Sequence, residues 1–404
     1  MTTIRALDCD AVGRKLEQAS GNWFPDLADK PVTARCNRGI RNRFSIGYQF
    51  ELRGGDARHE VFVKAPVESS AQQALEAGEE ATTHGDRPRL VPLLPVDVEA
   101  RLEANAMRVM RAHFDAHGPL CTGTMEVLDL VDEGLIVTKV IRQPTLAEQL
   151  RRAHWRRSRP KGDQLLLSFQ RAGEWLRCFH DMPPPERHQN RLTSRDELIQ
   201  VHLRFTEYLR STRIDATPLD DLHANFVRHV QRVLPDSFST VTGHADFGTH
   251  NIFAGDMSAG DQIVGFDTLA YWRTSPLEDI AYFLLLVETI PPMFIDRQLA
   301  VGRALLAEVR SAFLAGYFQG RDIPTEALQV YEMLVATEKW VSVAHSCTRA
   351  TGVRRTAKSL RLRIQQRALR RRIVRISNEL KCAAAATESR REALSKATMW
   401  RPVT

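Results

Sequence analysis

The stretch GHADFGTHNIF, residues 243–253, decides how this chain is interpreted. It places His244 two residues before Asp246, and Asn251 five residues after that aspartate. An aspartate can orient and accept a proton, and an amide oxygen can bind a hard metal ion. So short a pattern also arises by chance in polar surface loops. The rest of the chain must therefore decide between a surface loop and a catalytic loop.

The residues that follow the loop form a predicted hairpin. Two short apolar runs, NIFAGD and QIVGFD, are joined by the residues MSAG. The second run ends in Asp267, which the hairpin brings back towards Asn251. Phosphoryl transfer from a nucleoside triphosphate needs a carboxylate beside the attacking hydroxyl and oxygen ligands for Mg²⁺. Asp246, Asn251 and Asp267 have this chemistry, so a catalytic loop is favoured.

A positive charge must also hold the phosphates of the nucleotide. Lys64, in the run VFVKAP, lies near the end of a predicted strand in the first part of the chain. Taken alone, such a residue is more often a solvated strand lysine. The serines Ser45, Ser168 and Ser237 lack the G-x-S-x-G setting of a hydrolase nucleophile, so acyl transfer is not indicated.

The pattern of the chain predicts an α+β protein with two lobes. Strands are expected at residues 43–52 and 59–65, joined by a Gly54-Gly55-Asp56 turn, with an earlier strand in PVTARC. An irregular insertion at 67–95 precedes a helix at 97–117 and two strands in EVLDLVDEGLIVTKVI. After Pro144 the periodicity is mostly helical. We predict a β-rich nucleotide-binding lobe at 1–142, a helical lobe with the acceptor site at 143–348, and a basic tail at 349–404.

Composition narrows the class of protein. The chain has 404 residues, of which 43% are hydrophobic and 26% charged, enough for a large core. It shows no apolar run of membrane-spanning length and no secretory signal, so a cytoplasmic protein is expected. The six cysteines form no C-x-x-C pair, which favours isolated thiols over a zinc cluster or a disulfide framework.

The basic character is concentrated in the tail. Residues 349–381 carry 12 Lys or Arg and one acid, a net charge of +11, whereas the whole chain carries +7. Leu362, Leu369, Ile373, Ile376 and Leu380 recur at helical spacing if Gln366 fills one gap. The segment 354–381 is therefore a predicted amphipathic helix. Two interpretations are open. Either the apolar stripe packs on the body of the protein or on a second subunit of a homodimer, or the helix adsorbs to an anionic membrane surface. Nucleic acid is disfavoured, because no aromatic residues interleave with the arginines.

The sequence also resembles a known group of proteins. HADFGTHNIF, followed by IVGFDTLAYWRTSPLEDIAYF, resembles the catalytic region of the aminoglycoside phosphotransferase and choline kinase group, small-molecule kinases with a protein-kinase-like fold. The resemblance implies that Asp246 is the catalytic base and that Asn251 and Asp267 bind Mg²⁺. It further implies that His244 anchors the loop, that Asp279 braces it from the next helix, and that His180 at the end of RAGEWLRCFH has a supporting role.

The same resemblance implies a helix glutamate that pairs with Lys64. Glu103 fits best, and Glu76, Glu79 and Glu80 in the insertion are alternatives. No compact Gly-rich loop precedes Lys64, so ATP and GTP are both candidate donors. The expected reaction moves the γ-phosphate to a hydroxyl of a small molecule or glycan: an aminoglycoside, a sugar, an amino alcohol or a lipid-linked sugar. The alternative is a kinase-like binding protein without turnover, which acts at a membrane or in an assembly.

Overall fold

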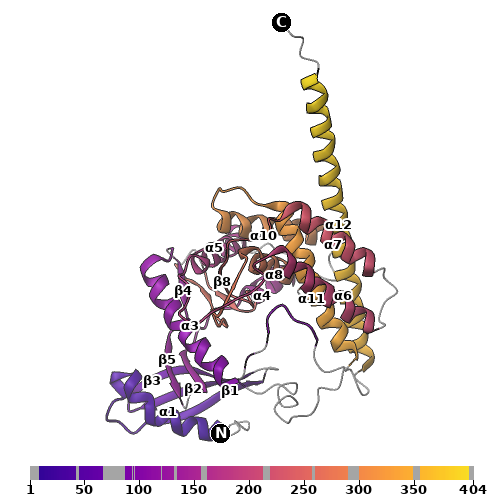
Figure 1. The fold of residues 1–404 in the computed structure, drawn as a ribbon. Helices are drawn as coiled ribbons and strands as arrows, with labels where there is room; N and C mark the ends of the chain where they lie inside the picture. The colour runs from indigo at the N-terminus through magenta and orange to yellow at the C-terminus, as the bar shows by residue number, and fades with distance from the viewer. Residues whose placement is uncertain are drawn as a thin grey trace.

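The computed structural model describes residues 9–41, 45–66, 87–92, 94, 96–119, 121–131, 134–155, 162–212, 219–256, 260–289, 300–348 and 355–399. A sheet-rich part formed by the first residues lies beside a larger helical part (Figure 1). Each part has its own cluster of buried apolar side chains. The predicted α+β architecture with a β-rich first part and a mainly helical second part is confirmed.

The first part is built on one five-stranded antiparallel sheet. Its strands are β1 (Thr33–Arg41), β2 (Ser45–Gly54), β3 (Ala57–Pro66), β5 (Val127–Val131) and β6 (Leu135–Lys139). They are ordered β1-β2-β3-β6-β5. Gly55, in the predicted turn between β2 and β3, has a φ of 59°, a conformation that glycine adopts at little cost. All the strands predicted for this region are present.

A helix that precedes the sheet corrects the cysteine prediction. α1 (Cys9–Trp23) packs on β1, and a short 3₁₀ turn, η1 (Pro25–Leu27), follows it. Cys9 of α1 and Cys36 of β1 form a disulfide, so the expectation of isolated thiols is wrong for this pair. The two cysteines are 27 residues apart in the sequence and meet because the helix packs on the strand. A short cysteine motif cannot indicate such a pairing. The other four cysteines are free.

α3 (Val96–His117) connects the sheet to the helical part and confirms the predicted helix at 97–117. It contacts β3 and β5, yet its buried residues, Met107 and Met110 among them, belong to the core of the helical part. The expected insertion at 67–95 lies largely outside the described residues. The lobe boundaries at 142 and 348 stay predictions, because α3 is shared between the two parts.

The second part is a helical assembly. Its helices are α4 (Leu146–Trp155), α5 (Gly162–His180), α6 (Arg195–Ser211), α7 (Leu219–Val233), α8 (Pro276–Thr289), α10 (Ala300–Phe318), α11 (Thr325–Thr348) and α12 (Arg355–Met399). α5 packs along α10, and α11 packs against α8, α6 and α12. The apolar faces of these helices enclose one continuous core.

Two small sheets are embedded among these helices. One contains β4 (Thr122–Thr124), β10 (Ile263–Gly265) and β9 (Ile252–Ala254), in that order, and the other contains β7 (Gln189–Asn190), β11 (Trp272–Thr274) and β8 (Val241–Gly243). β9 and β10 pair antiparallel, as predicted. The residues between β8 and β9 carry Asp246, so the loop of interest connects the two small sheets.

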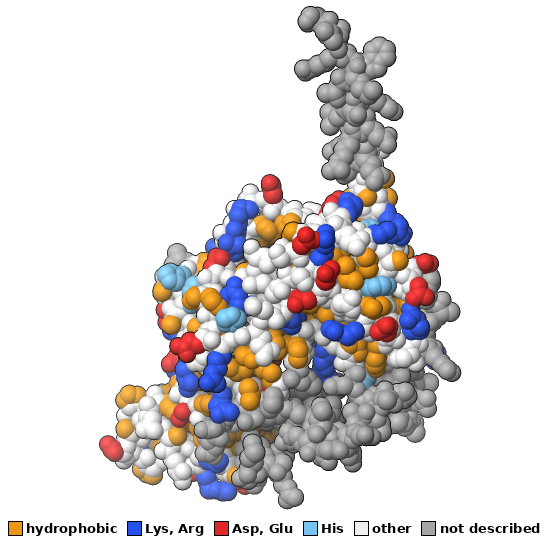
Figure 2. Space-filling model, in the orientation of Figure 1, with side chains coloured by type: hydrophobic (Ala, Val, Ile, Leu, Met, Phe, Trp, Pro, Cys, Tyr) orange, Lys and Arg blue, Asp and Glu red, His pale blue; other side chains and the backbone are white. Residues whose placement is uncertain are grey.

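The basic tail forms α12, which extends away from the body at its C-terminal end (Figure 1). Leu369, Ile373, Ile376 and Leu380 are buried, and α12 packs on α11 and α7. The apolar stripe therefore packs on the body of its own chain, as one of the predicted alternatives holds. On the face shown in Figure 2, basic and acidic side chains are interspersed over the helical part. Within the described residues, no helix has the length and apolarity needed to cross a bilayer.

Candidate active site

Asp246 lies at the centre of the loop between β8 and β9. Its Oδ1 accepts a hydrogen bond of 2.7 Å from the Tyr282 hydroxyl, and its Oδ2 accepts one of 3.0 Å from Asn251 Nδ2. The Nε2 of His250 lies 3.8 Å from the same Oδ2. The Asp246 side chain is 42% exposed, so solvent or a ligand can reach it. A carboxylate held on both oxygens and open on one side is suited to orient a hydroxyl group.

Asp279, at the start of α8, holds the backbone that precedes Asp246. Its Oδ2 accepts the N–H of His244 at 2.7 Å, and its Oδ1 accepts the N–H of Ala245 at 2.9 Å. Ala245 has a φ of 71°, a left-handed conformation that costs free energy for a residue with a Cβ. The two hydrogen bonds that Asp279 accepts hold the loop in this conformation; that Asp279 braces a catalytic loop stays a prediction.

His180 supports Asp279 from behind. Its Nε2 lies 3.1 Å from Asp279 Oδ2, and its Nδ1 lies 2.8 Å from the Tyr317 hydroxyl. Burial raises the pKa of Asp279, but the hydrogen bond and charge of His180 outweigh it and hold this pKa below its usual value. Asp279 therefore stays a carboxylate and keeps both acceptor oxygens for the loop. His180 therefore contacts Asp279, and its supporting role in the site stays a prediction.

His244 is packed as a core residue. It is 1% exposed, and its ring lies against the rings of Trp175, Phe179 and Phe247 at centroid distances of 6.0, 5.5 and 5.2 Å. Burial lowers its pKa, which favours the neutral imidazole. Neither ring nitrogen has a hydrogen-bond partner among the described residues. This position fits an anchor of the loop and not a base.

A second polar group joins the sheet to the hairpin. Lys64 Nζ on β3 donates to both oxygens of Glu103 on α3, at 2.8 and 2.7 Å, and it also forms an ion pair with Asp267 after β10. The structure therefore brings together three residues that lie far apart in the sequence. The alternative partners Glu76, Glu79 and Glu80 lie outside the described residues. Among the candidates that the structure describes, Glu103 is the one in contact.

The three charged groups of this triad shift one another's pKa values. Burial lowers the pKa of Lys64, but the carboxylates of Asp267 and Glu103 raise it above its ordinary value. Burial raises the pKa of Glu103 to about 7, although Lys64 opposes this shift. The pKa of Asp267 is held low because its ion pair with Lys64 outweighs the effect of burial. The ion pair therefore favours the charged forms of both Lys64 and Asp267.

The donor set suits Mg²⁺. Asn251 donates from its Nδ2 to Asp246, which leaves its amide oxygen as a candidate metal ligand, and Asp267 is a carboxylate that follows the second strand of the same hairpin. The N–H of Phe266 donates to Asn251 O at 3.1 Å, which fixes the two strand ends against each other. Among the described residues, no group of three or more His, Cys, Asp or Glu side chains forms a closed metal site. Two protein oxygen ligands would leave room for the phosphates and waters that Mg²⁺ usually keeps.

Sequence reasoning missed Tyr282. It lies three residues after Asp279 on α8, so both side chains project from the same face of the helix. This spacing was visible in PLEDIAYF and could have indicated that α8 contacts the loop twice. Burial and the charge of Asp246 raise the pKa of the Tyr282 hydroxyl well above its ordinary value, so it remains a donor to that carboxylate.

Comparison with known proteins defines the fold. No family model and no curated protein matches the sequence. Among solved structures, a Ralstonia eutropha JMP134 protein named as an aminoglycoside phosphotransferase matches with a TM-score of 0.54 and 12% identity, over 90% of this chain and 98% of that one. A glucosamine kinase in complex with glucosamine, ADP and inorganic phosphate matches with a TM-score of 0.44 and 13% identity, over 91% of this chain and 99% of that one. A GDP complex of aminoglycoside 2'-phosphotransferase-IIIa matches with a TM-score of 0.45 and 9% identity, over 88% of this chain and 99% of that one. The match to the Ralstonia protein, with a TM-score above 0.5, shows that the chain has the two-lobed, protein-kinase-like fold of that structure.

Proposed function

We propose that this protein is a Mg²⁺-dependent phosphotransferase that moves the γ-phosphate of ATP or GTP to a hydroxyl group of a small molecule or glycan. The observation that carries the proposal is the convergence of Lys64, Glu103 and Asp267 beside the loop of Asp246 and Asn251. These residues come from the sheet, from α3 and from both arms of the β9–β10 hairpin. Their chemistry matches what phosphoryl transfer requires.

In this mechanism Asp246 orients the acceptor hydroxyl and accepts its proton as the oxygen attacks the γ-phosphorus. Tyr282 and Asn251 hold the carboxylate in place for that attack. Lys64, positioned by Glu103, binds the phosphates of the nucleotide, and Asn251 and Asp267 would hold the metal ion. Mg²⁺ would neutralise the phosphate oxygens and stabilise the charge that develops on them. The bond to the nucleoside diphosphate breaks as the new phosphate ester forms.

The substitution Asp246→Asn tests the proposal. It keeps the shape of the side chain but removes the proton acceptor, so phosphotransfer should fall by about 10²- to 10⁴-fold. The binding of Mg-nucleotide, measured by titration of a fluorescent nucleotide, should be unchanged. Asp181→Asn is the matched control, because Asp181 is exposed and pairs only with Arg177 among the described residues. Full activity of Asp246→Asn would contradict the assigned role.

The alternative function is a kinase-like binding protein without turnover. It would be favoured if the wild type bound Mg-nucleotide but phosphorylated nothing in a screen of cell-extract metabolites and membrane glycolipids analysed by mass spectrometry. Two features support the active enzyme instead. The Asp246 side chain is partly exposed, and Lys64 contacts both Glu103 and Asp267.

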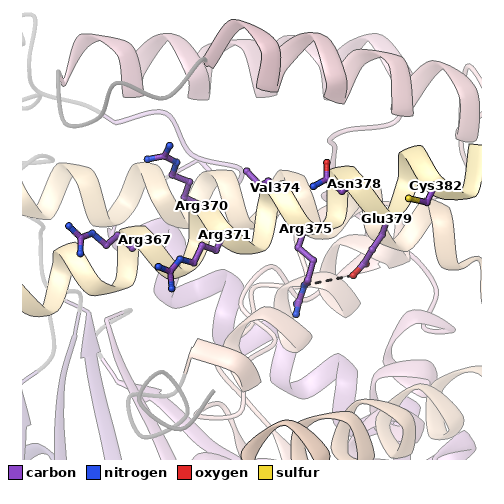
Figure 3. A pocket seen from close by; sticks show the side chains of 8 residues that line it. All are labelled: Arg367, Arg370, Arg371, Val374, Arg375, Asn378, Glu379 and Cys382. Carbon is purple, nitrogen blue, oxygen red and sulfur yellow. Dashed lines mark ion pairs between the residues drawn. The ribbon is translucent and has the colours of Figure 1, made fainter. Parts of the chain in front are cut away.

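The exposed side of α12 supports a separate proposal about location. Its arginines, together with Val374, line a groove of about 870 Å³ along the helix (Figure 3). Val374 is 47% exposed among these charges. We propose that this face adsorbs to an anionic membrane surface, which would favour a lipid-linked or membrane-proximal acceptor.

A variant with Arg367, Arg371 and Arg375 changed to Gln tests this location. Because each basic residue near an anionic surface contributes about 1 kcal/mol, liposome binding should weaken on the order of 100-fold. The liposomes contain phosphatidylserine, and binding is measured by co-sedimentation. Changing the exposed Arg14, Arg35 and Arg38 to Gln is the control with the same loss of charge. Equal liposome binding by the two triple variants would contradict the proposal that α12 binds the membrane surface.

A further inference from the structure

His250 lies in a tight turn of the loop between β8 and β9. The N–H of Asn251 donates to Gly248 O at 2.9 Å, which closes a β-turn with His250 as its third residue. The carbonyl of Thr249, a residue that is 2% exposed, accepts the N–H of Ala147 near the start of α4 at 2.9 Å. The backbone on both sides of His250 is therefore fixed to the body of the protein.

The side chain of His250 packs on the glycine of this turn. A Cβ on Gly248 would lie 2.6 Å from the Cε1 and 2.8 Å from the Nδ1 of the imidazole, so the ring lies against the Gly248 backbone. Only glycine leaves room for such a close approach. The Nε2 of the ring lies 3.8 Å from Asp246 Oδ2, and the His250 side chain is 53% exposed. An imidazole is thus held beside the candidate base, within reach of a ligand.

The gap between Nε2 and Oδ2 is too long for a hydrogen bond but fits one oxygen atom. An oxygen about 2.8 Å from each of the two atoms spans it, because hydrogen bonds of these groups are about 2.7–3.0 Å long. Asp246 Oδ2 already accepts from Asn251 Nδ2, and its second lone pair remains available. Among the described residues, none forms a hydrogen bond with His250 Nε2. Imidazole can donate from Nε2 in its neutral Nε2–H form and in its protonated form.

The contact between His250 and Asp246 has a simpler explanation, which is an ion pair between residues four apart on the surface. The two side chains are 53% and 42% exposed, and pairs of this kind contribute little to stability. The distance of 3.8 Å also leaves both groups without a hydrogen bond to each other. The position of the ring is therefore explained better by a ligand between the two groups than by the stability of the fold.

We propose that His250 is a further catalytic residue, whose Nε2–H donates to the attacking oxygen while that oxygen donates its proton to Asp246 Oδ2. This inference rests on the proposed phosphotransferase function. Around the acceptor oxygen, one tetrahedral direction holds its carbon, one the hydrogen bond to Asp246 and one the hydrogen bond from His250. The remaining lone pair forms the bond to the γ-phosphorus. The bond to the nucleoside diphosphate breaks, and the hydroxyl proton passes to Asp246.

His250 then acts by orienting the attacking oxygen, so its loss should lower the rate of transfer and leave the binding of Mg-nucleotide unchanged. Small errors in the position of a reacting group can cost up to about 100-fold in rate. A residue that only stabilised the loop would not require a donor at one particular place. The length of the side chain at this position therefore separates the two roles.

Three substitutions of His250 use this difference in length. His250→Gln places an amide N–H where the Nε2 of the imidazole lies, whereas the amide of His250→Asn is one bond shorter and reaches only the position of Nδ1. His250→Ala removes the donor. We expect kcat to fall about 10- to 100-fold in His250→Ala and in His250→Asn. His250→Gln should be faster than both.

Water and glycerol, each in large excess, are the acceptors in this experiment. The full chain is supplied with Mg-ATP or Mg-GTP, release of inorganic phosphate is measured, and glycerol phosphate is quantified by mass spectrometry. Titration of a fluorescent nucleotide gives the nucleotide affinity of every variant. His117→Ala, which removes an exposed histidine of α3, is the control and should change neither the rate nor the affinity. Thermal unfolding shows whether each variant is folded.

The outcomes separate this inference from the proposed function. Wild-type rates in His250→Ala, together with a strong loss in Asp246→Asn, overturn the role of His250 and leave the phosphotransferase intact. A loss of nucleotide affinity as large as the loss of rate also overturns it, because His250 would then contact the donor. So does a His250→Gln variant no faster than His250→Asn. A wild type that transfers phosphate to neither water, glycerol nor any compound of the metabolite screen overturns the proposed function, and this inference with it.

Discussion

At the scale of single residues, His202 makes the stability of the helical part depend on pH. It is fully buried in α6, its ring stacks on Phe226 with centroids 4.0 Å apart, and its Nδ1 lies 3.1 Å from His223 Nδ1. Burial, followed by the charge of His223, lowers the pKa of His202 to about 3. Since an unfolded histidine titrates near pH 6.5, the unfolded chain binds a proton that the folded chain rejects.

The free energy of unfolding should therefore fall as the pH is lowered from about 6.5 towards 3, by up to about 1.4 kcal/mol per pH unit from this residue. Above pH 6.5 the contribution is fully present. Urea unfolding at several pH values measures the slope. His202→Leu should reduce it, although His229, whose pKa burial lowers to about 4, keeps part of the dependence. His117→Gln, at an exposed position, is the control; equal slopes in wild type and His202→Leu would contradict the prediction.

The residues of the candidate site were predicted unequally well. Asp246, Asn251 and Asp267 are close in sequence, so their spacing alone placed them in one loop and in the hairpin that follows it. Lys64 and Glu103 were linked through the resemblance, and the structure then brought them into contact. Tyr282 was not predicted, because its contact with Asp246 depends on how α8 packs beside the loop between β8 and β9. That packing is a property of the whole helical part.

At the scale of elements, strands that pair with a neighbour in the sequence were predicted, whereas strands that pair with a distant segment were not. The β2–β3 and β9–β10 hairpins were predicted because a short turn joins two apolar runs. The sheet of β7, β11 and β8 was not predicted, since strands of two or three residues show no period. Likewise β4 was missed, because it pairs in parallel with β10 far along the chain. Such strands exist only once the surrounding helices hold them together.

One of these missed pairings positions Asp267. The indole N–H of Trp175 on α5 donates to Gly123 O on β4 at 2.8 Å, and its ring covers β10 at Gly265. A Cβ on Gly265 would lie 2.5 Å from that ring, so glycine is required for this close approach. Asp267 follows two residues later with a φ of 64°. The direction of the metal-ligand candidate thus depends on a tryptophan from another helix.

At the scale of the whole molecule, α12 is both part of the core and a charged surface. Its buried face includes Arg372, which is 3% exposed and forms ion pairs with Glu288 on α8 and with Glu332 on α11, the latter at 2.9 Å. On the adjoining face, Arg232 of α7 donates to the Leu380 carbonyl at 3.2 Å. The tail is therefore tied to three helices of the body. A basic segment that only adsorbed to other molecules would not need these contacts.

We therefore expect that deletion of α12 destabilises the protein instead of only changing its binding. A chain that ends at residue 353 loses four buried Leu and Ile side chains, each of which contributes about 1.5–3 kcal/mol. Their sum is of the same order as the total stability of a typical domain. This chain should lack a cooperative thermal transition, whereas a chain that ends at residue 386 keeps the stripe and should unfold close to the wild-type temperature. Calorimetry of both checks this, and a stable chain ending at 353 would contradict it. The lipid binding that we propose for α12 must therefore be tested by charge substitution, because deletion of the helix would abolish any such binding by unfolding the protein.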